Sequence, residues 1–330
     1  MDETLLDAES VIPYMRSRGL LRGPATARVL AGGVSNIVFA VTDGSRSLVL
    51  KQSLERLRVV DEWIAPRRRI LSEAAALGVV AELTPNVTPE ILDVDSARMT
   101  LTMLRAPAEW RDWKTDLMSG RINSAVPDRL GRLLGVWHSS TWDVAALPAV
   151  LRDDTEAFEQ LRLNPYFETV ARQSPDVATR VREIAERLHH TRSCLVHGDF
   201  SPKNILSGED GQCWVIDFEV AHFGDPAFDV AFLLTHLLLK SLYRSELADE
   251  YDAAARAFLA AYKGPGLVIP FERISDQVAC LLLARVRGKS PVEYLDNVGR
   301  SAAWNLGVRL LDSPANALVE VLVQRKDVIK

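Results

Sequence analysis

A polar segment set between short apolar runs constrains the fold of this chain more than any other feature. Residues 195–204 read Leu-Val-His-Gly-Asp-Phe-Ser-Pro-Lys-Asn, and residues 215–219 read Val-Ile-Asp-Phe-Glu. Asp199, Asn204 and Asp217 each adjoin an apolar run of the kind that forms a buried strand. Because strands this short can meet in a turn, we expect these three oxygen-bearing side chains to lie close together.

Such a group of oxygen atoms suits Mg²⁺, which takes one or two protein carboxylates and keeps coordination positions for phosphate oxygens. Protein kinases have the same Asp-to-Asn spacing in the pattern H-R-D-x-x-x-x-N, followed by D-F-G. Here Gly198 replaces the Arg and Glu219 replaces the last Gly. The spacing therefore indicates a phosphoryl-transfer loop with two departures from the protein-kinase pattern.

These motifs resemble those of the aminoglycoside phosphotransferase and choline kinase superfamily, small-molecule relatives of the protein kinases. Gly198 is the residue that this family usually carries where protein kinases have Arg. Residues 223–231 read Phe-Gly-Asp-Pro-Ala-Phe-Asp-Val-Ala and are similar to the family's Gly-Asp-Pro-x-x-Asp motif. The matched motifs lie in residues 195–231, and weaker elements extend the resemblance over most of the chain.

The resemblance implies an α+β, protein-kinase-like bilobal fold. Its N-terminal lobe holds a five-stranded antiparallel sheet with a helix, and its C-terminal lobe is mainly helical. Because Ala106-Pro107 ends the preceding strand character, we place a nucleotide-binding lobe at residues 1–104 and a catalytic and substrate-binding lobe at residues 105–330. The hinge whose backbone faces the adenine would then be formed by Thr102, Met103 and Leu104.

Composition is ordinary for a soluble globular protein, with 48% apolar and 25% charged residues among 330. A net charge of −5 argues against a protein that holds nucleic acid by its phosphates. Apolar runs stay shorter than the roughly 18 residues of a membrane span, and the acidic start lacks the basic region of a signal peptide. Three cysteines without a C-x-x-C pair predict buried thiols rather than disulfides or zinc. We therefore expect a cytoplasmic protein with no membrane partner.

Patterns along the N-terminal lobe agree with a sheet. Asp43-Gly44 is a strong two-residue hairpin signal. Alternating and β-branched runs predict strands over 27–31, 37–42, 47–51, 89–94 and 98–104, and a short helix is predicted over 4–19.

A glycine-containing loop and a lysine are the candidates for binding nucleotide phosphates. Glycine lets backbone N–H groups approach a phosphate closely, and the loop contains Gly32, Gly33, Ser35 and Asn36. The loop does not match G-x-G-x-x-G, so a plain glycine turn is the alternative. Lys51, at the end of the third strand, can reach the α- and β-phosphates; the alternative is an ordinary lysine at a strand end.

A helix is predicted over residues 66–78, with Pro66 at its start and Gly78 just past its end. Glu73 falls on the apolar face of this helix. A carboxylate there needs a partner, and Lys51 is the natural one, as in the Lys–Glu pair of kinase-like folds. The alternative is a slightly rotated helix with Glu73 in solvent.

The second lobe is predicted to be mainly helical. Asp225 is a helix N-cap followed by proline at the first helical position, and the resemblance implies that Asp229 braces the catalytic loop through hydrogen bonds. Helices are predicted over 130–137, over 153–191 with breaks at Pro165 and Pro175, and over 227–240, 276–287 and 292–312.

The resemblance also implies the roles of the site residues, with ATP and Mg²⁺ as cofactors. Asp199 would accept the proton of the acceptor hydroxyl, supported by Lys51 and Glu73. Asn204 and Asp217 would hold Mg²⁺. Lys203 would meet either the γ-phosphate or water.

The acceptor is expected to be a small hydroxylated molecule: a sugar, an amino alcohol or an aminoglycoside. The segment 285–290 is basic, which suits a neutral sugar or an anionic metabolite better than a polycation. Candidate lining residues are Glu219, His222, Asp225, Arg287, Glu293 and Trp304. Two alternatives stay open at this point, a non-catalytic nucleotide-binding regulator and a metal-dependent phosphohydrolase.

Overall fold

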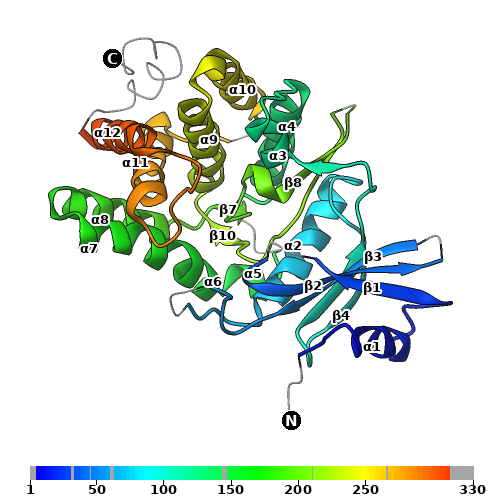
Figure 1. The fold of residues 1–330 in the computed structure, drawn as a ribbon. Helices are drawn as coiled ribbons and strands as arrows, with labels where there is room; N and C mark the ends of the chain where they lie inside the picture. The colour runs from blue at the N-terminus through cyan, green and yellow to red at the C-terminus, as the bar shows by residue number, and fades with distance from the viewer. Residues whose placement is uncertain are drawn as a thin grey trace.

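A five-stranded antiparallel sheet forms the first part of the computed structural model (Figure 1). The structure describes residues 5–30, 33–44, 46–59, 63–142, 147–209, 211–264 and 267–312. The strand order is β1-β2-β3-β5-β4, which confirms the predicted sheet. Its strands are β1 Ala25–Val29, β2 Asn36–Asp43, β3 Arg46–Ser53, β4 Ile91–Asp95 and β5 Thr100–Leu104.

The two faces of this sheet pack against different helices. Strand side chains alternate between faces, so Leu50 and Lys51 of β3 point in opposite directions. Leu50 joins a cluster with Val11 and Met15 of α1 (Val11–Ser17). Lys51 points toward α2 (Arg69–Leu83), which lies between the sheet and the helical region in Figure 1.

The helix α2 is longer than predicted. It begins at Arg69 and ends at Leu83, so the prediction that Gly78 follows the end of the helix is wrong. A Cβ at Gly78 would meet nothing within 4 Å. Leu77 and Val80 are buried against the core, and this tertiary packing outweighs the weak helix propensity of glycine.

The rest of the chain is mainly helical, as predicted. α9 runs through the centre of this region and packs on α10 and α11 (Figure 1). The helices are α3 Trp113–Met118, α4 Ala125–Ser140, α5 Ala149–Arg152, α6 Glu156–Phe158, the π-helix η1 Glu159–Glu168, α7 Thr169–Gln173, α8 Pro175–His190, η2 Pro202–Asn204, α9 Pro226–Tyr243, η3 Ser245–Leu247, α10 Ala248–Ala261, α11 Phe271–Arg287 and α12 Asn297–Asp312.

Short strands carry the catalytic segment between these helices. One antiparallel pair joins β7 (Cys194–Val196) to β10 (His222–Gly224). A small sheet joins β6 (Arg111–Asp112), β8 (Ile205–Ser207) and β9 (Cys213–Val215). The motif residues therefore lie at the ends of strands, where their polar groups are outside the apolar core.

Several predicted helix boundaries are corrected, including that of the first helix, which spans Val11–Ser17 rather than residues 4–19. η1 continues through Pro165 into α7, because buried neighbours such as Tyr166 and Phe167 hold the wider π-helical turn in place. α12 begins at Asn297 rather than at 292, so residues 288–296 connect it to α11. None of the helices in the described part of the chain combines the length and the apolar character needed to span a membrane.

Candidate active site

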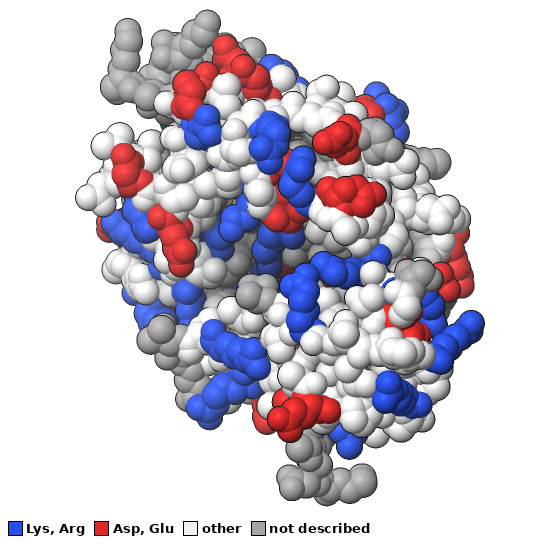
Figure 2. Space-filling model, turned by 45° about the vertical axis from the view of Figure 1, so that its right-hand side comes forward, with Lys and Arg blue, Asp and Glu red and all other residues white. Residues whose placement is uncertain are grey.

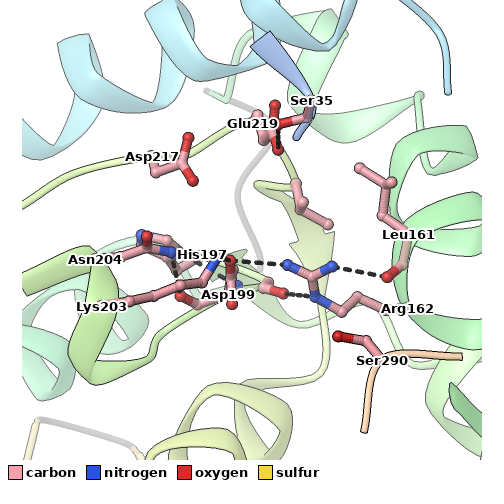
Figure 3. Close-up of polar contacts among 12 residues, drawn as sticks. Ser35, Leu161, Arg162, His197, Asp199, Lys203, Asn204, Asp217, Glu219 and Ser290 are labelled. Carbon is pink, nitrogen blue, oxygen red and sulfur yellow. Dashed lines mark hydrogen bonds and ion pairs between the residues drawn. The ribbon is translucent and has the colours of Figure 1, made fainter. Parts of the chain in front are cut away.

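The structure brings together the three side chains that define the motif (Figure 3). Asp199 follows β7, Asn204 ends η2 and Asp217 follows β9. The Nδ2 group of Asn204 donates hydrogen bonds to Oδ2 of Asp199 at 2.9 Å and to its carbonyl oxygen at 3.0 Å. Asp217 lies beside them with φ of 70°, a backbone conformation that few non-glycine residues adopt and that is common at functional sites.

A buried carboxylate on α9 holds the catalytic loop. Asp229 accepts hydrogen bonds from the backbone N–H groups of His197 at 2.6 Å and Gly198 at 2.9 Å, which is the bracing that the family resemblance implied. Gly198 has φ of +74°, and a Cβ there would lie 2.6 Å from the carbonyl oxygen of Val220. No larger residue fits this turn without strain, which explains the glycine in place of the protein-kinase arginine.

Both ring nitrogens of His197 are hydrogen-bonded to the backbone. Its Nε2 lies 3.1 Å from the carbonyl oxygen of Ile216, and its Nδ1 accepts from the backbone N–H of Asp199 at 3.1 Å. Nε2 therefore carries the proton and donates a hydrogen bond to that carbonyl oxygen. Burial lowers the pKa of His197, so the neutral imidazole is favoured.

Two cations flank Asp199. Arg162 Nη2 lies 3.0 Å from its Oδ2, and Lys203 Nζ lies 2.8 Å from the same atom. Burial alone would raise the pKa of Asp199, but Arg162 and Lys203 outweigh burial and hold this pKa below its usual value. The carboxylate is therefore ionised at neutral pH.

Arg162 was not identified from the sequence. It lies on η1 and also donates from Nε to the carbonyl oxygen of Gly198 at 2.8 Å. Its side chain is almost completely buried. The one signal in the sequence is an arginine between Leu161 and Leu163 in a segment with apolar character, because a buried arginine needs a specific partner.

A lysine and two carboxylates join the sheet to the catalytic segment. Lys51 Nζ donates to Glu73 at 2.7 and 2.8 Å and to Asp217 at 2.6 Å. Burial by itself lowers the pKa of Lys51, but the carboxylates of Asp217, Glu73 and Glu219 outweigh it and raise this pKa. Glu73 is 1% exposed, so the predicted Lys51–Glu73 pair is present and the solvent-facing alternative is wrong.

The residues around Asp217 fit a Mg²⁺ ion that shares its coordination with phosphates. The Nδ2 group of Asn204 donates to Asp199, so its amide oxygen is the atom of this side chain that suits a cation. One carboxylate, one amide oxygen and phosphate oxygens form a donor set that Mg²⁺ accepts. Within the described residues, no three His, Cys, Asp or Glu side chains group into a metal site.

Glu219 does not line the acceptor cleft as predicted. It is buried, and it accepts hydrogen bonds from Ser35 Oγ at 2.7 Å, Asn36 Nδ2 at 2.8 Å and Arg69 Nε at 3.1 Å. Figure 3 shows the Ser35 contact. The side chains of Ser35 and Asn36 are therefore occupied by Glu219 in this conformation. Gly33 is exposed, and Gly32 lies outside the described residues.

His222 and Asp225 are structural residues as well, which corrects the prediction that they line the cleft. The ring of His222 lies 4.2 Å from that of Phe158, and burial lowers its pKa to about 4. Asp225 caps α9 and accepts from Arg273 at 2.6 Å and Gln277 at 3.0 Å. Both side chains are buried and already bonded.

Arg287 and Trp304, both predicted to line the acceptor cleft, contact each other. The guanidinium of Arg287 lies 3.9 Å above the Trp304 ring, and its Nη1 donates to Ser174 Oγ at 3.2 Å. Arg285 lies two residues earlier, on the opposite side of α11, and contacts Tyr166. Arg285 thus lies over the same Tyr166 ring as Arg162, the partner of Asp199, whereas Arg287 lies over Trp304; Glu293 is exposed.

The residues predicted to form the hinge lie at the end of β5. Thr102 and Met103 lie inside β5, whose backbone pairs with β3 on one side and β4 on the other. The N–H groups of Leu104 and Arg105 also donate within the sheet, to Glu90 and Ser47.

Comparison with known proteins assigns the family. The model of the phosphotransferase enzyme family matches residues 26–267. Methylthioribose kinase from Bacillus pumilus is 26% identical over 255 residues, which make up 68% of this chain and 63% of that protein. The match thus spans less than two thirds of that relative's length.

Two solved structures share the fold. Choline kinase LicA from Streptococcus pneumoniae has a TM-score of 0.56 at 16% identity, covering 92% of this chain and 98% of its own. Amicoumacin kinase hAmiN, in complex with AMP-PNP, Ca²⁺ and Ami, has a TM-score of 0.55 at 17% identity, covering 92% and 94%. Because the family model matches well over half of the sequence, the chain belongs to the phosphotransferase enzyme family of small-molecule kinases, as its motifs predicted.

Proposed function

We propose that this chain transfers the γ-phosphate of ATP to a hydroxyl group of a small molecule. The observation that carries the proposal is the convergence of Asp199, Asn204 and Asp217, with Lys51 bonded to Asp217 at 2.6 Å. This group combines a base, two oxygen ligands and a cation. Phosphoryl transfer needs mostly such positioning and charge neutralisation.

Asp217 and the amide oxygen of Asn204 would hold Mg²⁺, which neutralises charge on the nucleotide phosphates when it is bound. Lys51, held by Glu73, would bind the phosphates as a point charge. The amicoumacin kinase structure with AMP-PNP and Ca²⁺ supports a nucleotide and a divalent cation in a protein of this fold.

Asp199 would accept the proton of the acceptor hydroxyl. The low pKa of Asp199 makes it a weak base. A weak base is sufficient, because in a loose transition state the acceptor hydroxyl loses its proton only late in the transfer. Lys203, half-exposed and bonded to Asp199, stands where it can meet the transferred phosphoryl group. The methylthioribose kinase match supports a sugar as one acceptor class, beside amino alcohols and aminoglycosides.

Coupled ADP release with Mg-ATP and a panel of hydroxyl acceptors tests the proposal. Acceptor-stimulated ADP release should fall by about 100-fold or more in Asp199→Ala, since a positioned base contributes roughly 10²–10⁴-fold. Asp176→Ala, an exposed carboxylate of α8, is the control and should keep wild-type activity. Mg-ATP binding without any acceptor stimulation would favour the regulator, and no Mg-ATP binding would refute the proposal.

A further inference from the structure

Basic and aromatic side chains continue from Asp199 into the helical region. Arg162, the partner of Asp199, lies 5.7 Å from the ring of Tyr166 and 5.6 Å from that of Phe232. These two rings stack with 6.2 Å between centroids. They form a wall that leads away from the phosphoryl-transfer centre along α9.

The inner face of α9 extends this wall. Phe232, His236 and Lys240 are four residues apart and so share one face of the helix. The rings of Phe232 and His236 lie 5.2 Å apart. Lys240 Nζ lies 3.5 Å from the carbonyl oxygen of His236, one turn nearer the catalytic loop. The ammonium group therefore lies back along α9, beside the turn that carries His236.

Lys240 is a buried cation without a carboxylate partner. Its side chain is almost fully buried, with 1% of the residue exposed. Among the described residues it forms no ion pair within 4.0 Å, and its nearest aromatic contact is Tyr294 at 5.7 Å. Burial, together with Lys114 and Arg285, lowers the pKa of Lys240 to about 7. Burying an ammonium group without a counter-ion costs folding free energy unless a ligand neutralises the charge.

Arg285 is a second cation near Lys240, since its charge helps to lower the pKa of Lys240. Its Nη1 donates to the carbonyl oxygen of Ser290 at 2.6 Å and to Ser290 Oγ at 3.1 Å. Its Nε is buried without a hydrogen-bond partner, and so is the hydroxyl of Tyr294. Buried donors left this way are rare in proteins and call for a ligand or an ordered water.

Most of the charges around His236 and Lys240 are positive. Burial and then Lys240, Arg285, Lys203 and Lys114 lower the pKa of His236, so these four cations lie near one imidazole. Asp112 is the acidic group that favours the charged form of Lys240. Figure 2 shows Lys and Arg side chains gathered around a hollow in the middle of one face of the molecule. A polycationic acceptor would be repelled here.

We infer that the acceptor carries an anionic group, a carboxylate or a phosphate, that binds Lys240 and Arg285 while its hydroxyl faces Asp199. This inference rests on the proposed function, because it names the acceptor class for the same site. Lys240 supplies a compact charge and Arg285 a second cation with an unused Nε donor. The bound anion would restore full charge to the buried ammonium.

Matched acceptors that differ by one anionic group test the inference. Pantothenate and panthenol, 4-hydroxybutyrate and 1,4-butanediol, and ribose 5-phosphate and ribose form such pairs, with choline as a cationic acceptor. ADP release with Mg-ATP should favour the anionic member of a pair by at least about tenfold in kcat/KM, the scale of one charge-assisted hydrogen bond. Transfer that favours the neutral members or choline would overturn the inference and leave the kinase proposal intact.

Single substitutions test whether Lys240 and Arg285 bind the anionic group of the acceptor. Lys240→Met and Arg285→Met should raise the KM of the anionic acceptor by about tenfold or more, with the KM of ATP unchanged, because each removes a charged donor. Lys263→Met, at an exposed lysine, is the control. An unchanged acceptor KM in both site variants would refute the assignment.

A binding measurement decides the question if no acceptor of the panel is phosphorylated. With Mg-AMP-PNP present, rising malonate or inorganic phosphate should raise the Tm of the wild type and of Lys263→Met but not of Lys240→Met. A response to malonate alone identifies a carboxylate, and a response to phosphate alone identifies a phosphate. Equal shifts in the wild type and Lys240→Met, or no shift at all, would overturn the inference. Loss of Mg-AMP-PNP binding would instead refute the proposed function.

Discussion

The hydroxyl of Ser35 donates a 2.7 Å hydrogen bond to the carboxylate of Glu219, 184 positions further along the chain. Asn36 and Arg69 donate to the same carboxylate. Arg69 is 1% exposed, so Glu219 neutralises a buried guanidinium while it ties the start of β2 to the catalytic segment. The residue that replaces the last glycine of D-F-G is thus a fixed connection between the sheet and the metal ligand Asp217 that we propose.

Glu219→Ala should lower the free energy of unfolding by about 3 kcal/mol, because truncating one partner of a buried ion pair leaves the other charge uncompensated. Urea unfolding at neutral pH measures this loss. Glu246→Ala removes a surface partner of Arg244 and should leave the unfolding free energy nearly unchanged. Similar losses in both variants would show that the buried network has no special role.

Asp229→Ala should reduce kcat by about 100-fold, since small displacements of a catalytic group can cost that much. The backbone N–H groups of His197 and Gly198 lose their acceptor in this variant, and Asp199 loses its fixed position. The KM of ATP should change little, because Asp229 contacts neither Lys51 nor Asp217. Steady-state kinetics separate the two constants, and a loss confined to KM would contradict the positioning role.

The local part of this site could be predicted from the sequence. Asp199 and Asn204 are five positions apart, and the turn between β7 and β8 fixes their distance, so spacing alone carries the information. Lys51 and Glu73 were predicted from periodicity, because a carboxylate on the buried face of a helix needs a cation on the adjacent strand. These relationships depend on one turn or on one helix packed against a sheet.

Relationships set by tertiary packing could not be predicted. Arg162 reaches Asp199 only because η1 passes beside the catalytic loop, and no spacing rule connects the two residues. Glu219 was expected to face an acceptor, but Ser35 and Arg69 enclose it. Arg285 and Arg287 look alike in sequence, yet α11 turns them to opposite sides, and a rotation of the predicted helix by about half a turn would exchange them.

Arg162→Met should move the acid limb of the pH–rate profile to higher pH. In the wild type, the cations Arg162 and Lys203 outweigh burial and hold the pKa of Asp199 below its ordinary 3.8. Only the ionised carboxylate accepts a proton, so activity persists until the pH falls toward this low pKa. Removing Arg162 raises the pKa, and activity is then lost at a higher pH. Profiles of kcat/KM measure the shift, with Arg180→Met as a control on another carboxylate, Asp276.

Lys51→Met and Glu73→Gln should each reduce kcat/KM for ATP, and the double variant should lose less than the sum of the two free-energy changes. The residues contact each other at 2.7 Å, and paired residues show coupling of about 0.5–3 kcal/mol in double-mutant cycles. Additive losses would mean that Glu73 acts independently of Lys51.

Asp217→Asn and Asn204→Ala should raise the Mg²⁺ concentration needed for half-maximal activity by at least about tenfold, the scale on which altered metal-site residues weaken affinity. Asp217 supplies the charge of the proposed site and Asn204 a neutral oxygen, so the loss should be larger for Asp217→Asn. Titration of Mg²⁺ at saturating ATP measures both values, with Asp176→Asn as the matched surface control. Asn204 also holds Asp199 through Nδ2, so Asn204→Ala should lower kcat even at saturating Mg²⁺. A variant with reduced kcat but a wild-type Mg²⁺ requirement would place Asn204 with the base rather than with the metal.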